Sequence, residues 1–153
     1  MTILRTLEDL RSLYAEPTAR VLRKEASPRG GEPGFVQVLD PYTLLIPDAP
    51  GNNRLDTLQN ILATSQASLL FFIPGVDEML RIHGTAVLRT DADLLARFAN
   101  LARPPKLVIQ VTLRGAYMHC AKAMMRSRLW APESRVDRSR LPSMGQMIKD
   151  HAQ

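Results

Sequence analysis

The hydrophobic positions of this chain follow two periods, one typical of strands and one typical of helices. Residues 35–39 (FVQVL) alternate, a turn follows at Asp40-Pro41-Tyr42, and residues 43–47 (TLLIP) return, which predicts a hairpin. Residues 79–90 alternate around Gly84, a pattern typical of a bulge or a barrel bend. Residues 106–120 alternate over the length of a long strand, and the short apolar run 67–75 predicts a buried strand.

Helix spacing is found between these strands and at both ends of the chain. Residues 4–14 and 18–25 predict an amphipathic N-terminal pair of helices. Thr90-Asp91 opens a helix that runs to about Leu101, and a last helix carries AKAMMRSRLW, residues 121–130. Antiparallel strands with a few helices beside them predict an α+β fold that is mainly β, built around a small barrel.

The helix predicted from Leu55 onward has an unusual start. Leu55, Leu58 and Ile61 lie on one face, Asn53 is placed to cap, and Asp56 completes a near capping box. Arg54 then falls in the first turn, where a cation costs up to about 1 kcal/mol unless an anion offsets it. With the free N–H groups of the turn and the hydroxyl of Thr57, Arg54 makes a candidate phosphate site. An arginine pointing into solvent, or paired with a nearby aspartate, remains the alternative.

Composition favours one soluble domain over residues 1–153, with N-terminal helices to residue 26, a core over 27–132 and a C-terminal tail. Hydrophobic residues make up 45% of the 153 positions, enough for one core. Glu8 and Asp9 interrupt the apolar stretch that a signal peptide would need, and residues 69–73, the longest apolar run, cannot span a bilayer. We therefore expect a cytoplasmic protein without a membrane segment.

The net charge of +5 attracts anions, and the excess of basic residues lies toward the C-terminus. Nucleic acid is not the expected partner, because Trp130 is the only aromatic residue among those bases. His119 and Cys120 cannot complete a zinc site, so no metal is expected. As neighbours on a strand they point to opposite faces, so a Cys120 nucleophile with His119 as its base is not favoured, and Cys120 is interpreted as a small buried residue.

Four blocks in order resemble one family. They are SPRGGEPGFVQVLD, LLIPDAPGNNRLDTLQNIL, LLFFIPGVDEMLRIHGTAVL and HCAKAMMRSRLW, within residues 27–132. Together they are similar to the pyridoxamine 5'-phosphate oxidase-like flavoproteins, the FMN-binding split β-barrels, and most of all to a bacterial branch of them. The resemblance implies a cytoplasmic homodimer with FMN in clefts between subunits, acting as an oxidoreductase on an unidentified small substrate.

The resemblance also implies a cofactor site. Arg54, Thr57 and the backbone of Asn53 match the positions that hold the FMN phosphate, and the main chain at Pro47 and Asp48 matches that along the flavin ring. The full set is Ser27, Arg29, Pro47, Asp48, Asn53, Arg54, Thr57, Asn60, Lys122, Arg126 and Trp130. Since the flavin carries out the electron transfer, no catalytic acid or base is required and no catalytic residue is assigned. Arg29, His119 and Lys122 are candidates to polarise the flavin or bind an anionic substrate.

The chain departs from the family pattern at Gly31, Met79, His83 and Thr85. Roughly thirty residues with the first barrel strand are also missing before Ser27, which leaves a strand edge that something else must cover and which favours a dimer. Two alternatives follow. One is a binding module that keeps the barrel without turnover or without FMN, and the other is oxidation of pyridoxamine phosphate itself.

Overall fold

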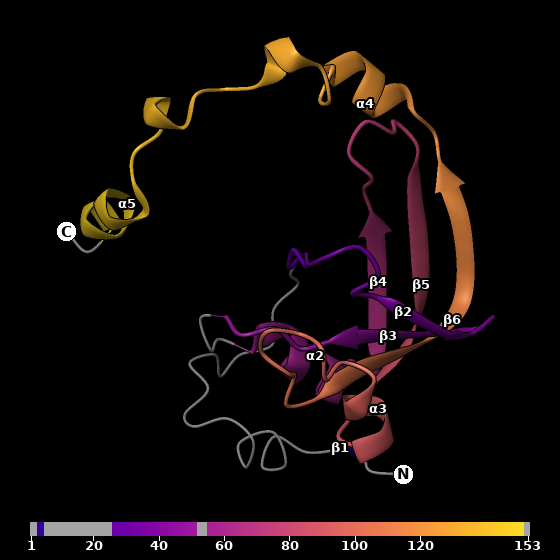
Figure 1. Ribbon diagram of the computed structural model, residues 1–153. Helices are drawn as coiled ribbons and strands as arrows, with labels where there is room; N and C mark the ends of the chain where they lie inside the picture. Colours follow the sequence, from indigo (N-terminus) through magenta and orange to yellow (C-terminus); the bar gives the residue numbers. More distant parts are fainter. Residues whose placement is uncertain (1–2, 5–25, 52–54, 152–153) are drawn as a thin grey trace. The chain divides into compact units, whose positions relative to one another are not determined.

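The computed structural model describes residues 3–4, 26–51 and 55–151, which form an antiparallel sheet with short helices (Figure 1). This confirms the α+β fold class. The strands are β1 (Ile3–Leu4), β2 (Gln37–Asp40), β3 (Thr43–Pro47), β4 (Gln66–Phe71), β5 (Met79–Arg89) and β6 (Val108–His119). The helices are α2 (Asp56–Thr64), α3 (Ala92–Ala96), α4 (Lys122–Ser127) and α5 (Met144–His151), with 3-10 turns η1 (Pro132–Ser134) and η2 (Arg138–Arg140).

The sheet follows the order β1-β5-β6-β3-β2, and β4 also pairs with β5. β3 pairs antiparallel with β6 from Thr43↔Thr112 to Pro47↔Val108. Past Thr112, which pairs with the first residue of β3, β6 continues to His119. β2 pairs with β3 through Val38↔Leu44, with a bulge before Asp40. Within the described ranges β2 has a single strand neighbour and forms one end of the sheet.

The hairpin and the two long alternating strands lie where the sequence predicts them. The β2–β3 turn is held by the Tyr42 amide, which donates to Asp40 Oδ1 at 2.8 Å, and the Tyr42 carbonyl accepts from the Leu113 amide of β6. Gly84, at the centre of β5, lies against β6 so closely that a Cβ would be 2.1 Å from the Thr112 carbonyl oxygen. The glycine predicted as a bulge or bend is therefore a site of close strand approach that excludes any side chain.

Two sequence predictions about the strands are wrong. Leu4, expected in a helix, pairs with Leu88 as part of β1; the rest of the predicted N-terminal helix pair, residues 5–25, lies outside the described residues. The apolar run predicted as a buried strand forms β4, whose residues alternate between exposed and half-buried. β4 pairs with β5, and its residues are exposed on one face and half-buried on the other, so that Leu70 is 48% exposed.

Helix α3 covers one face of the sheet and completes the core there. Leu94 and Phe98 pack in one cluster with Leu45 of β3 and Val108 of β6. The helix opens after Asp91, within the predicted start at Thr90-Asp91, but regular helix ends at Ala96 instead of about Leu101. After α3 the chain continues in turns, in which the Phe98 amide donates to the Leu95 carbonyl and the Leu101 amide donates to the Phe98 carbonyl. The predicted segment is therefore compact but is not one helix.

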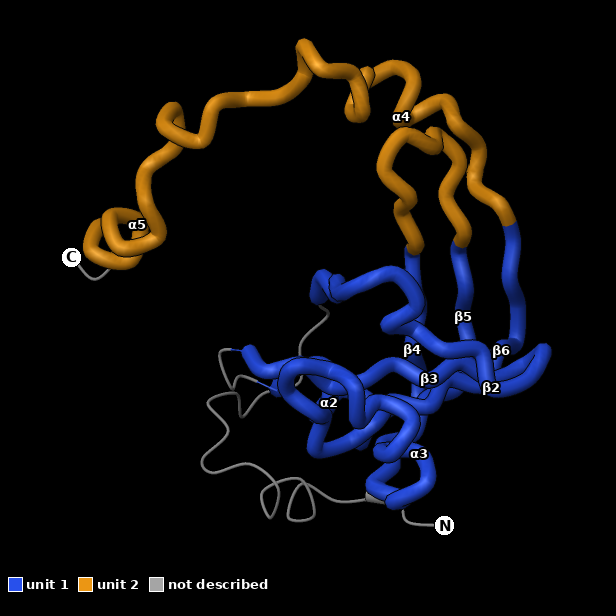
Figure 2. The backbone as a smooth tube through the Cα atoms, viewed as in Figure 1, with its two compact units in different colours: residues 1–70, 81–117 blue, residues 71–80, 118–153 orange. Residues whose placement is uncertain are grey.

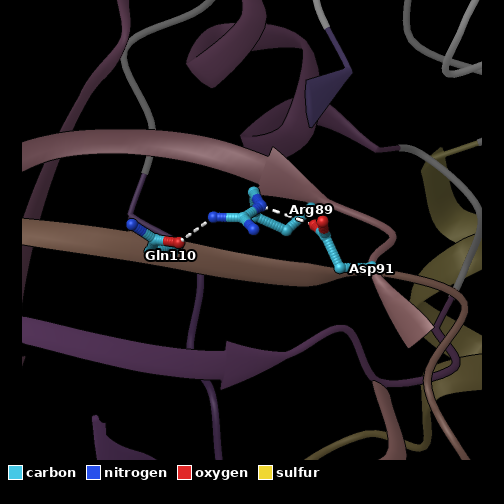
Figure 3. A network of polar contacts seen from close by, with 3 residues as sticks. All are labelled: Arg89, Asp91 and Gln110. Carbon is cyan, nitrogen blue, oxygen red and sulfur yellow. Dashed lines mark hydrogen bonds and ion pairs between the residues drawn. The ribbon is translucent and has the colours of Figure 1, made fainter. Parts of the chain in front are cut away.

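Polar contacts hold both ends of α3 against the sheet. At its start, Arg89 of β5 binds Asp91 through Nε at 2.6 Å and Gln110 of β6 through Nη1 at 2.5 Å (Figure 3). At its end, Arg97 Nε donates to Gln37 Oε1 of β2 at 3.0 Å, and Gln37 Nε2 donates back to the Arg97 carbonyl at 3.1 Å. Helix α3 is thereby tied to β5, β6 and β2 at once.

The chain divides into two compact units (Figure 2). The first, residues 1–70 and 81–117, contains the core described above. The second, residues 71–80 and 118–153, contains the β4–β5 connection, α4 and everything after it, and Met79 is its one buried residue among those described. Its exposed large apolar side chains are Phe72, Ile73, Val76, Met118, Met125, Leu129, Val136, Leu141, Met144 and Ile148.

No helix in the described ranges has both the length and the apolar character needed to cross a membrane.

Candidate functional site

The first part of the candidate site is the end of strand β3. Pro47 is buried and pairs with Val108, and the Asp48 amide donates to the Leu107 carbonyl at 3.1 Å. The ladder between β3 and β6 thus fixes the main chain through Asp48. Beyond Asp48 the chain leaves the sheet.

Helix α2 begins at Asp56, one residue later than the spacing predicts. Leu55 occupies the N-cap position with a left-handed backbone (φ 58°) and no side-chain cap. A left-handed turn at Leu55 therefore sets the entry into the helix. Arg54 precedes the helix instead of standing in its first turn. Asn53 and Arg54 themselves lie outside the described residues.

The first turn of α2 retains the feature needed for anion binding. The Gln59 amide donates to the Leu55 carbonyl at 3.0 Å, so the backbone amides of Asp56, Thr57 and Leu58 lie in the first turn of the helix. Thr57 is the second helical residue and is half-buried. Amides of this kind, at the positive end of the helix dipole, suit a phosphate.

The apolar face predicted for α2 anchors the helix. Leu58 and Ile61 are buried at 1% and 4% exposure, and Leu55 is half-buried. Gln59 is buried as well, which the apolar spacing did not indicate. Asn60 is half-buried one turn after Asp56, and its carbonyl accepts from the Thr64 hydroxyl at 2.7 Å. The buried side chains of Leu58 and Ile61 thus fix the start of α2 by packing.

Ser27 and Arg29 lie together in the exposed loop before β2. Arg29 Nη1 donates to the Ser27 hydroxyl at 2.7 Å. Both side chains are exposed, and the guanidinium keeps further N–H groups directed away from this contact. The block that resembles the family motif is therefore locally ordered by its own two polar residues.

The C-terminal group lies in the second unit. α4 ends at Ser127, because Arg128 adopts a left-handed C-cap (φ 51°), so the predicted helix stops short of Trp130. Lys122 and Arg126 are exposed on α4. The Trp130 Nε1–H donates to the Val76 carbonyl at 2.8 Å, joining the chain after α4 to the β4–β5 connection. This partner, fifty-four positions away, could not be found from the sequence.

The predicted site residues therefore fall into two groups. Pro47, Asp48, Thr57 and Asn60 flank residues 49–55 in the first unit, and Ser27 with Arg29 belongs to the same unit. The second unit contains Lys122, Arg126 and Trp130. The structure brings Asp48 and Thr57 to the two ends of one short connection and pairs Ser27 with Arg29.

The interpretation of Cys120 as a buried residue is wrong. Cys120 follows the last strand residue, His119, and is exposed, as are the last four residues of β6. No group of three histidine, cysteine, aspartate or glutamate side chains in the described ranges is arranged to bind a metal ion.

Comparison with known proteins gives one family. A family model described as pyridoxamine 5'-phosphate oxidase matches residues 15–120. A search of curated proteins finds no match. Among solved structures, HupZ of Group A Streptococcus and a histidine-to-alanine variant of it are similar at 17% identity and a TM-score of 0.45. The variant aligns over 55% of this chain and 72% of its own, and HupZ over 54% and 67%. Similarity at this level carries no function to this chain.

Proposed function

The chain belongs to the pyridoxamine 5'-phosphate oxidase family, and on that basis we propose that it binds FMN and acts as an oxidoreductase on a small substrate. The observation that carries the proposal is the connection 49–55, which joins the end of β3 to the start of α2. Arg54 lies in this connection, and a guanidinium beside helix-start amides is well suited to a phosphate monoester.

The residues that would hold FMN have separate tasks. The amides of the first turn of α2, the Thr57 hydroxyl and Arg54 bind the phosphate, and the main chain at Pro47 and Asp48 lies along the ring. Asn60 supports the phosphate loop from the next turn of α2. When bound, the flavin supplies hydride or electron transfer, and the protein contributes binding, orientation and exclusion of water.

The cationic side chains outside the phosphate loop complete the proposed site. Arg29 is held by Ser27 with part of its guanidinium still available, and Lys122 and Arg126 are exposed on α4. Positive groups of this kind stabilise a reduced, anionic flavin or attract an anionic substrate. His119 and Trp130 belong to the same C-terminal block, which in the proposed dimer borders the cofactor.

A titration of the purified apo-protein with FMN and with riboflavin tests the proposal. FMN is expected to bind at least tenfold more tightly than riboflavin, because only FMN carries the phosphate that the α2 start and Arg54 would bind. Absorbance of the flavin and quenching of its fluorescence report binding. Equal affinities would contradict the phosphate site, and failure of the folded protein to bind either ligand would contradict FMN binding altogether.

The proposed state in solution is a cytoplasmic homodimer. In support, the second unit exposes ten large apolar side chains and buries only Met79 among its described residues, and β2 ends the sheet with Val38 67% exposed. Monomeric proteins rarely leave large apolar surfaces uncovered, and sheet edges favour pairing. Light scattering at micromolar concentration should give about twice the 17.1 kDa chain mass. A monomer that still binds FMN would contradict a cleft between subunits.

A binding module without FMN is the second candidate. It is favoured by β2, which ends the sheet in the described residues and so lacks the neighbour that a further barrel strand would provide. The FMN titration separates the two candidates, since a folded dimer that binds no flavin is the outcome that the module predicts.

A further inference from the structure

Three polar and aromatic side chains meet on the exposed face of β5 and β6. None of them is among the residues assigned to FMN. Arg81 Cζ lies 5.8 Å from the centre of the Tyr117 ring, over its face. The His83 ring lies 6.5 Å from the same centre, inclined at 65°, in an edge-to-face arrangement. All three belong to the first unit, and Tyr117 is 44% exposed.

Gly115 of β6 fixes the place of His83 in this cluster. A Cβ at Gly115 would lie 2.5 Å from His83 Cε1 and 2.8 Å from Nε2, so the imidazole rests on bare backbone. Any other residue at position 115 would push the ring away from the strand. The ring is thereby seated beside Tyr117 at the edge of the cluster.

The positive charge of the cluster has no acidic partner in the part of the chain that the structure describes. Among the described residues, no carboxylate forms an ion pair or hydrogen bond with Arg81 or His83, whereas Arg89 and Arg128 each pair with one. Both side chains are exposed, so the guanidinium can present two parallel N–H groups while its plane stays near the tyrosine.

We propose that Arg81, His83 and Tyr117 form a binding site for a small aromatic carboxylate. The guanidinium matches a carboxylate in a bidentate arrangement, and the imidazole adds a donor beside it. The phenol ring offers a surface for a second flat ring. An anion without a ring would bind only the guanidinium of Arg81. A neutral aromatic compound would contact only the ring of Tyr117. The site requires neither flavin nor a second subunit.

Benzoate is the probe that tests this site, in an NMR titration of the full chain without FMN. Saturable shifts at the amides of Gly115 and Tyr117 are expected, with a dissociation constant of about 1 mM, because the cluster lies on a strand face instead of in a cavity. Cyclohexanecarboxylate, benzamide and inorganic phosphate should each bind at least fivefold more weakly. No saturable shift, or phosphate binding as tight as benzoate, would overturn the proposal.

Variants locate the binding. Arg81→Gln should weaken benzoate binding at least tenfold. Tyr117→Leu should lower the affinity for benzoate to the affinity that the unaltered protein has for cyclohexanecarboxylate. Arg114→Gln removes an equal charge from an exposed position of β6 and should change the affinity less than twofold. Equal losses in Arg81→Gln and Arg114→Gln would mean that only net charge attracts benzoate, which contradicts the site. The ligand series on the unaltered protein still decides the matter if Tyr117→Leu does not fold.

Discussion

Gln110 accepts a hydrogen bond of 2.5 Å from Arg89, although the two residues lie on different strands and twenty-one positions apart. The same guanidinium binds Asp91, with side-chain exposures of 12% for Arg89 and 10% for Asp91. Buried charges are costly unless they are paired and hydrogen-bonded. Here one arginine satisfies both demands and connects β5, β6 and the start of α3 (Figure 3).

Arg89→Met should lower the free energy of unfolding by about 2–3 kcal/mol, because it removes the guanidinium that pairs with the half-buried Asp91 carboxylate. Gln110→Leu should cost only about 1–2 kcal/mol, since the guanidinium keeps Asp91. Chemical denaturation followed by circular dichroism measures both.

The double variant Arg89→Met, Asp91→Leu provides the control. Replacing both charges by apolar groups should restore at least half of the stability that Arg89→Met loses. Arg128→Ala, which removes an arginine paired with Glu133 at 66% and 53% exposure, should change stability by less than about 0.5 kcal/mol. If Arg89→Met loses no more stability than Arg128→Ala, the pair of Arg89 and Asp91 contributes nothing to the free energy of unfolding.

Arg54→Ala should weaken FMN binding by about 1.5–3 kcal/mol, the usual contribution of a hydrogen bond to a charged group. Riboflavin should be little affected, because it has no phosphate. Arg128→Ala is the matched control, and its affinity should equal that of the parent protein. If Arg54→Ala binds FMN as tightly as the parent, the phosphate lies elsewhere.

Trp130→Leu and Trp130→Phe separate two roles of the indole. Both variants lose the 2.8 Å hydrogen bond from the indole N–H to the Val76 carbonyl, and each should lose about 0.5–1.5 kcal/mol of stability. If Trp130 also borders the cofactor, as we propose, removing the indole should brighten bound FMN, because a nearby indole quenches flavin fluorescence. Unchanged fluorescence and FMN affinity with lowered stability would restrict Trp130 to holding the β4–β5 connection.

The turn η2 should respond to acid through Asp137. Hydrogen bonds from the Ser139 hydroxyl and amide, at 2.7 and 2.8 Å, hold the pKa of Asp137 below its usual 3.8. A lowered pKa in the folded chain means that the stabilisation is complete above pH 3.8 and is lost as the pH falls through the lower folded value. NMR of the Ser139 amide should show a midpoint below 3.8. Ser139→Ala should raise the midpoint of Asp137, and no change would contradict the hydroxyl bond.

Much of the candidate site could be predicted because it depends on neighbouring residues. Ser27 and Arg29 pair across two positions, and Pro47 and Asp48 end the second strand of the predicted hairpin. The cap of α2 could not be predicted in the same way. Asn53 has the better capping side chain, but Leu55 takes the left-handed turn that lets the helix bury Leu58 and Ile61. Burial on that face is decided by the whole sheet.

Periodicity and local chemistry in the sequence determined the hairpin, the long strands β5 and β6 and the α+β class, whereas the close approach of the strands at Gly84 was found only in the structure. The tertiary structure alone decided which apolar residues are covered, so β4 is half-exposed and Cys120 lies at the surface. It also selected the distant partners, Gln110 for Arg89 and Val76 for Trp130. The reason is physical: alternation specifies which residues share a face, whereas cover and pairing depend on elements that only folding brings near.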